Sequence, residues 1–151
     1  MRPIAIGLTA ALALAALVPA TVISAAKDKE KPAAVDAKAR EAGMKAAPDV
    51  AKAAGISCTV TDARLIGNDK KTSTDYYEVA CQQGLGFALL AKKDAAPQAY
   101  SCLETAQPGA DGKPSALACL LPANADPKTG LAPYLAKANT ACDIQNARAI
   151  G

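Results

Sequence analysis

The centre of the chain alternates between short apolar segments, rich in β-branched and aromatic residues, and polar turns. This alternation is typical of antiparallel strands joined by tight connections. The later apolar run 115–122 fits either a further strand or a helical turn. We therefore expect an α+β, β-dominated fold, a small antiparallel sheet with short flanking helices. The four predicted strands cover residues 57–66, 75–82, 87–93 and 98–104.

Short helices are expected on both sides of this sheet. Pro48 and Asp49 suit the first turn of a helix and Gly55 suits its end, so the pattern predicts a helix over 48–55. Residues 131–141 resume helical spacing. Residues 27–47 are rich in alanine, lysine and acids and have a helical propensity, but alanine buries little area, so we expect a mobile or loosely docked tether.

Residues 1–26 have the organisation of a secretory signal peptide. Arg2 gives a positive start, residues 4–18 are apolar, and small residues follow Pro19. The stretches 18–20 and 24–26 are both candidate cleavage sites, and we favour cleavage before Lys27. An uncleaved anchor is the alternative, but about 15 apolar residues are short for a span that needs about 20. The expected location is the periplasm or the extracellular space, with no stable membrane span after cleavage.

A stretch of the first predicted strand recurs at the end of the chain. CTVTDARLIG begins at Cys58, and CDIQNARAIG begins at Cys142. Both contain the cysteine, an aliphatic residue, Asp or Asn, Ala-Arg, Ile and Gly, and such internal similarity indicates a repeat. We assign 48–130 to one disulfide-stapled repeat module and 131–151 to the start of a second, incomplete repeat. Either the chain is a fragment of a longer repeat protein, or the second copy completes the first module.

Four of the five cysteines belong to the first repeat. Four cysteines allow three pairings. If the first two strands form a hairpin, Cys58 lies near Cys81, and Cys102 and Cys119 flank a polar loop in the same way. We predict these two bridges, which close loops of about 23 and 17 residues and contribute about 3 kcal/mol each in the chain-entropy picture. They matter because a chain with one Phe and no Trp builds a weak core.

Cys142 has no partner in this scheme. Its partner lies in residues beyond this chain, or it forms an intermolecular disulfide, or it is a reactive thiol. The last reading makes the chain a thiol-redox protein that uses Cys142.

Charge and the missing histidine narrow the chemistry. The 17 Lys and Arg residues are interleaved with 14 Asp and Glu residues, so there is no basic stripe for nucleic acid and no charged patch for a membrane. Without histidine the chain has no Ser-His-Asp or Cys-His arrangement. Without a Cys-x-x-Cys pair a zinc site is not expected either. We expect no catalytic residue, no metal and no cofactor.

Tyrosines are the remaining candidates for a ligand surface. Tyr76 and Tyr77 are neighbours on one predicted strand, so one of them faces outward, and Tyr100 lies on another. Stacked on sugar rings, these residues would make the chain a carbohydrate- or peptidoglycan-binding module, with an envelope polysaccharide as its partner. In the competing interpretation, one tyrosine fills the core and another covers the sheet.

Charged residues on the strands are expected to be structural. Asp75 and Glu78 point to opposite faces of their strand, which does not suit a catalytic carboxylate pair. Arg64, which recurs as Arg148, is expected to pair with Asp62 or Glu78 on the same sheet face.

The order of these motifs resembles a family of exported bacterial repeat proteins of unknown function. The shared features are the Asp/Asn-Ala-Arg strand after a cysteine, the aromatic-Glu-Val-x-Cys strand, the Gly-x-Gly-aromatic turn and two later cysteines, over about residues 58–121. The resemblance supports the repeat and the cysteine pairing and implies no activity. The expected function is an exported, non-enzymatic structural or binding module of the cell envelope or extracellular space.

Overall fold

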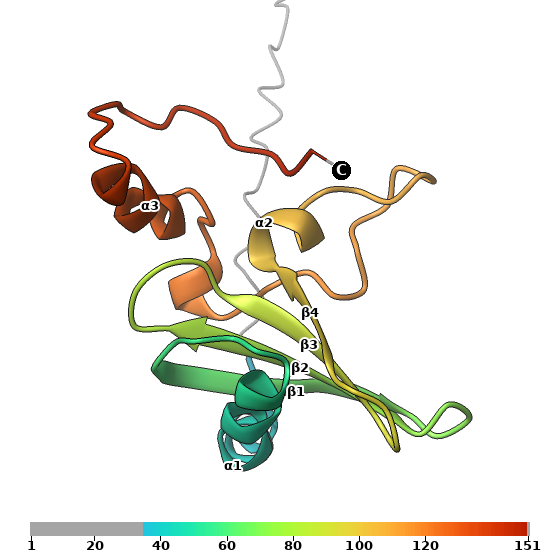
Figure 1. Cartoon of the computed structure of the whole chain (residues 1–151). Coiled ribbons are helices and arrows are strands. Elements are labelled where there is room, and N and C mark those ends of the chain that lie inside the picture. Colours follow the sequence, from blue (N-terminus) through green and yellow to red (C-terminus); the bar gives the residue numbers. More distant parts are fainter. Residues whose placement is uncertain (1–34, 151) are drawn as a thin grey trace, which may run out of the picture. The chain divides into compact units, whose positions relative to one another are not determined.

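The computed structural model describes residues 35–150. The predicted signal peptide and the first part of the predicted tether lie outside the described residues. The described part contains a helix, four strands and several short helical turns (Figure 1). In chain order these are α1 Ala37–Ala53, β1 Val60–Asp69, β2 Thr74–Cys81, β3 Phe87–Lys92, β4 Gln98–Ser101, α2 Cys102–Thr105, the 3₁₀ turns η1 Pro122–Asn124 and η2 Thr129–Leu131, and α3 Ala132–Lys137.

The four strands form one antiparallel sheet in the order β1-β2-β3-β4, which confirms the α+β, β-dominated prediction. Each strand pairs with the next along the chain because the connections are short. One cross-strand row runs through Arg64, Glu78, Ala88 and Tyr100. Directly opposed residues share a face, so these four side chains lie on the same side of the sheet.

β4 ends earlier than predicted, at Ser101 and not at 104. The reason is a capping box that starts α2. The Ser101 hydroxyl accepts a hydrogen bond from the Glu104 backbone N–H at 3.2 Å, and the Ser101 backbone N–H donates to the Glu104 carboxylate at 2.6 Å. These paired bonds turn the chain out of the sheet before Cys102.

For residues 37–47, the prediction of a loosely docked tether is wrong. They do not form a loose tether but the first part of α1, and the boundary placed at 47/48 falls inside this helix. Gly43, Ala47 and Ala51 are buried four residues apart, on one helix face. A Cβ on Gly43 would lie 2.4 Å from the Cα of Arg64. The small residues that suggested weak burial are therefore what lets α1 approach β1 so closely.

The end of α1 confirms the predicted role of Gly55. Its φ of 76° is a left-handed conformation that glycine adopts at little cost. The N–H of Gly55 bonds to the carbonyl of Lys52, and the N–H of Ile56 bonds to that of Ala51, as in a Schellman motif. The turn also brings Ile56 against the core.

The two faces of the sheet carry different covers (Figure 1). On one face, Tyr77, Val79 and Leu89 form a cluster with the buried alanines of α1. On the other face lie α2 and the irregular segment 118–124, which bonds to Glu78.

α3 occupies part of the predicted 131–141 helix, and residues 142–150 form no strand. Among the described residues, no helix has the length and apolar character needed to cross a bilayer.

Candidate functional site

Both predicted disulfides are confirmed. Cys58 pairs with Cys81, and Cys102 pairs with Cys119, with Cα atoms 5.6 Å apart in each bridge. That separation is typical of disulfides. The first bridge joins the open end of the β1–β2 hairpin, and the second ties α2 to the segment that covers the sheet. Cys142 is the free, exposed cysteine of the described chain.

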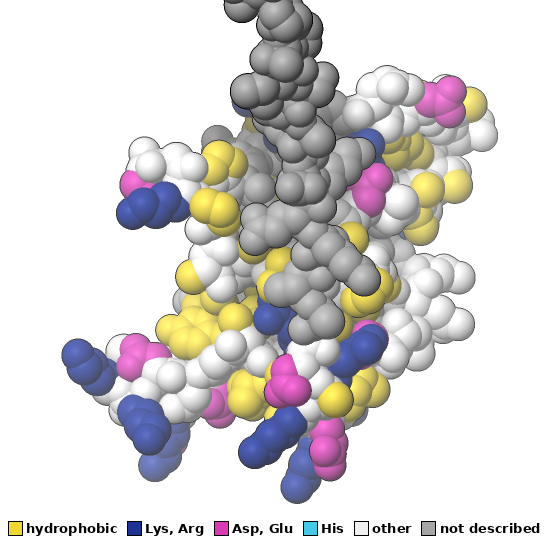
Figure 2. Space-filling model, turned by 180° about the vertical axis from the view of Figure 1, so that it is seen from behind, with side chains coloured by type: hydrophobic (Ala, Val, Ile, Leu, Met, Phe, Trp, Pro, Cys, Tyr) yellow, Lys and Arg dark blue, Asp and Glu magenta, His cyan; other side chains and the backbone are white. Residues whose placement is uncertain are grey.

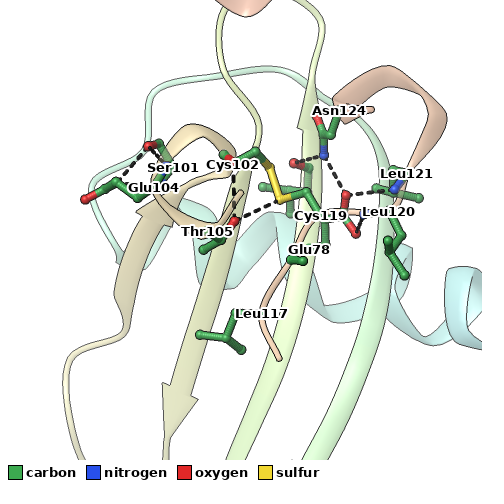
Figure 3. Close-up of a disulfide and its surroundings, with 12 residues drawn as sticks. Glu78, Ser101, Cys102, Glu104, Thr105, Leu117, Cys119, Leu120, Leu121 and Asn124 are labelled. Atoms are coloured by element: carbon green, nitrogen blue, oxygen red, sulfur yellow. Dashed lines mark hydrogen bonds between the residues drawn. A yellow bond between two sulfur atoms is a disulfide. The ribbon is translucent and has the colours of Figure 1, made fainter. Parts of the chain in front are cut away.

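Next to the second bridge, the carboxylate of Glu78 is fully buried and accepts four hydrogen bonds (Figure 3). The backbone N–H groups of Leu120 and Leu121 donate to it at 2.9 and 2.8 Å. The Asn124 side-chain amide donates at 2.9 Å, and the fourth donor is the Nε of Arg64. A buried carboxylate needs this many partners because it has lost its water. Glu78 thereby holds the covering segment on the sheet.

Arg64 completes this network from the neighbouring strand. Its predicted partner was Asp62 or Glu78, and the structure selects Glu78. A second guanidinium nitrogen, Nη2, donates to the carbonyl of Ala118 at 3.1 Å. Asp62 instead pairs with Arg40 of α1. The side-chain contact with Asp62 raises the pKa of Arg40 above its usual value, first by hydrogen bonding and then by charge.

Asn124 reaches Glu78 because two glycines shape the turn before β3. Gly84 has a φ of 88°, which favours glycine. Gly86 has a different reason, since a Cβ there would lie 2.1 Å from the Oδ1 of Asn124. The Asn124 amide also donates to the carbonyl of Val79 at 3.1 Å. The Gly-x-Gly turn therefore leaves the space that the buried Asn124 amide occupies.

Glu78, Cys102 and Cys119 place one carboxylate oxygen and two sulfurs within 4.8 Å of one another. Three such groups could hold a metal ion if the sulfurs were thiolates. In the disulfide the sulfurs are bonded to each other, and the carboxylate oxygens already accept hydrogen bonds. In this oxidised form the cluster has a structural role. The Thr105 hydroxyl also contacts it, at 3.7 Å from the Cys119 sulfur (Figure 3).

The structure separates the three candidate tyrosines. Tyr77 is buried in the cluster under α1, and burial, followed by the charge and hydrogen bonding of Asp75, raises the pKa of its hydroxyl. Tyr76 and Tyr100 lie on the opposite face, the face of Glu78. Tyr100 is 39% exposed. Tyr76 lines an open pocket of about 370 Å³ together with Ile66 and Leu117.

Cys142 borders an open hollow of about 760 Å³ beside α3. The lining residues include Leu135 of α3 and Lys128. The sulfur is thus accessible to a reagent or to another molecule.

Charges on the visible surface are mixed (Figure 2). Basic and acidic side chains lie beside one another along the lower edge. At the tip of the β1–β2 hairpin, hydrogen bonds from Thr72 and the Lys71 backbone lower the pKa of Asp69. Asp69 is thus a structural residue of this turn.

Sequence reasoning missed Asn124 and the capping pair Ser101 and Glu104. The Ser-x-x-Glu spacing is a known signal for a helix start and could have revealed the capping pair. Nothing local marks Asn124, because its partner Glu78 is 46 residues away.

Comparison of the chain with family models, curated proteins and solved structures finds no match.

Proposed function

We propose that this chain is an exported, non-enzymatic module that serves a structural or binding role in the cell envelope or extracellular space. The observation that supports it best is the pair of disulfides. Disulfides persist in oxidising compartments and are rare in the cytosol. The signal-like pattern of residues 1–26 points to the same location.

The buried network around Glu78 also favours a scaffold. Catalytic acids and bases must reach the proton that they transfer. The Glu78 carboxylate is fully buried and bonded to backbone amides. Its hydrogen bonds hold the covering segment on the sheet.

Expression of the whole sequence in a bacterial host tests this proposal. We expect a processed chain outside the cytoplasm that begins near Lys27 and carries both disulfides, with only Cys142 open to alkylation. Intact mass and non-reducing peptide mapping of the fractions measure this. The matched control lacks residues 1–26 and should stay in the cytoplasm with its cysteines reduced. Retention of the full-length chain with reduced cysteines would contradict the proposal.

A second candidate function is polysaccharide binding through Tyr76 and Tyr100. It is favoured by their position on one sheet face, with Tyr76 and Leu117 at the open pocket. Tyrosine rings suit sugars because one side is apolar and the hydroxyl can hydrogen-bond. Retention on peptidoglycan or a polysaccharide resin should fall when Tyr76→Ala and Tyr100→Ala are combined. Tyr134→Ala, an exposed tyrosine on α3, is the control. Equal retention of all three proteins would exclude this function.

A further inference from the structure

The C-terminal residues 142–150 repeat the side chains through which β1 is held. The contacts that hold β1 and the residues just before it include the Cys58 disulfide, the fully buried side chain of Ala63, and the ion pair of Arg64 with Glu78. At the same spacing, the C-terminal stretch carries the corresponding residues Cys142, Ala147 and Arg148.

The two exposed positions that differ between the stretches change freely: Asp143 and Gln145 replace Thr59 and Thr61. At the half-buried positions, Val60 and Asp62 change only to the similar Ile144 and Asn146, whereas Leu65 becomes the smaller Ala149. A coincidence between two alanine-rich stretches would not separate contact positions from exposed ones. What recurs is therefore the contact set of a strand.

Within the described chain, residues 142–150 lie outside the sheet as an irregular segment. Two hydrogen bonds hold its backbone, from Gln107 to the carbonyl of Ala149 at 2.9 Å and from Lys128 to that of Gln145 at 3.5 Å. Arg148 is exposed, and Ile150 is 83% exposed. Cys142 and Arg148, the counterparts of Cys58 and Arg64, thus face water in this second copy, and Ala147, the counterpart of the buried Ala63, is half-buried.

The strand that fits this segment must present a glutamate and a cysteine at the spacing of β2. The pattern Glu-x-x-Cys occurs once in the chain, at Glu78 and Cys81. Access is through β1, which is one of the two edge strands of the sheet and the one that pairs with β2. The Cys58–Cys81 bridge is half-buried and borders a pocket of about 150 Å³, whereas Cys102 of the other bridge is 2% exposed. A second copy of this chain offers such a β2 when its β1 separates.

We propose that residues 142–150 are a donor strand that replaces β1 on β2 of a second copy, fastened by a disulfide from Cys142 to that copy's Cys81. The Cys142 thiolate attacks the Cys81 sulfur, the Cys58–Cys81 bond breaks, and Cys58 leaves as a thiolate that takes up a proton. One disulfide and one thiol are present before and after, so no oxidant is needed. Arg148 then takes the place of Arg64 opposite Glu78. The proposal needs only the folded sheet and the free thiol, and does not rest on export.

A mixture of two full-length chains tests this exchange. The acceptor is isotope-labelled and carries Cys142→Ser, and the donor is unlabelled. After incubation at pH 8, we expect peptide mapping to find unlabelled Cys142 joined to labelled Cys81, with labelled Cys58 newly open to alkylation. Attachment to Cys58, Cys102 or Cys119 in equal yield would overturn the proposal, as would the absence of any mixed disulfide.

Two donor variants separate strand replacement from simple thiol collision. Arg148→Ala removes the counterpart of Arg64 and should lower the yield of the Cys81–Cys142 link at least about tenfold, because Glu78 loses its ionic partner. Gln145→Ala alters the counterpart of the exposed Thr61 and should leave the yield within about twofold. Both residues are exposed in the donor, so its fold is not at risk. Equal yields from the two variants would overturn the proposal, as would a Cys81–Cys142 link formed only within one molecule.

Discussion

The two faces of the sheet are held by different means. Under α1, small and apolar residues such as Ala47 and Ala63 pack together, and the Arg40–Asp62 ion pair joins α1 to β1 outside this cluster. On the other face, a disulfide and a buried carboxylate that accepts three hydrogen bonds from the segment hold an irregular stretch of chain. Apolar packing is not directional and needs only fitting shapes. An irregular segment leaves backbone N–H groups unpaired, and each needs a hydrogen-bond acceptor when it is buried. Glu78 provides that acceptor for two of them.

The difference shows how a chain with few large apolar residues covers both sides of a sheet. A helix satisfies its own backbone, so α1 could be built from alanine and glycine. The segment 118–124 cannot, and its polar groups are used as the means of attachment. Changes on the two faces should therefore have separable effects.

Glu78→Ala should have the largest effect, and it should act on the covering segment. Arg64, Asn124 and two backbone N–H groups lose their acceptor, so we expect a loss of about 3–5 kcal/mol in the free energy of unfolding. Urea denaturation measures the loss, and hydrogen exchange should show 118–124 released while α1 stays protected. Glu104→Ala, at the exposed capping box, should cost about 1 kcal/mol. If Glu78→Ala lowers the free energy of unfolding no more than Glu104→Ala does, Glu78 is not what holds the covering segment on the sheet.

Replacing both Cys102 and Cys119 by alanine should cost about 3 kcal/mol for the loop that they close. The Glu78 hydrogen bonds remain, so the segment should loosen around α2 rather than detach. Urea denaturation and hydrogen exchange measure this. Reducing agent applied to the double variant should add a further loss of similar size, about 3 kcal/mol, because it opens the Cys58–Cys81 loop. Full loss of protection in 118–124 would mean that the disulfide, and not Glu78, attaches it.

Gly43→Ala tests the helix face and should reverse the usual sign. In an ordinary helix interior the change gains about 1 kcal/mol. Here the new Cβ would lie 2.4 Å from the Arg64 Cα, so α1 must move from β1. We expect a net loss of about 1–3 kcal/mol by thermal or urea unfolding. Lys45→Gly, at an exposed position of the same helix, should show the ordinary cost of about 1 kcal/mol. A gain for Gly43→Ala would disprove the close packing.

Tyr77 should give the smallest effect, a loss of stability at alkaline pH. Its folded pKa is raised, so its contribution is fully present below the unfolded pKa of about 10 and is lost as pH rises through the folded value. Unfolding should be compared at pH 8 and above 10 in a Cys142→Ser background, which prevents thiol exchange. Tyr77→Phe should decline less, because it lacks the buried hydroxyl whose pKa is raised. If both proteins lose the same stability at alkaline pH, the apolar cluster does not raise the pKa of Tyr77.

Much of the sheet could be predicted because its signals are local. Strand composition, turn residues and Gly55 act over a few positions, and hairpin pairing of the first two strands predicted Cys58–Cys81. Cys102 and Cys119 also pair across a loop as predicted, but Cys102 begins α2 and Cys119 lies in the irregular segment, so strand pairing does not bring them together. The candidate ligand surface was predicted less well, since alternation alone could not choose between Tyr76 and Tyr77 for the buried place. The structure puts Tyr77 in the core and leaves Tyr76 at the pocket.

The sequence by itself determined the strands, their order and the cysteine pairs, because each depends on contacts between near neighbours. Only the tertiary structure decided that an alanine-rich stretch is a core helix, that Glu78 collects donors from 42 to 46 residues away, and that two similar stretches take different forms. Cys58 leads into a strand because a neighbouring strand offers it Cys81 and Glu78. Residues 142–150 carry the same side chains without such a neighbour in the described chain, so similar sequence remains irregular there.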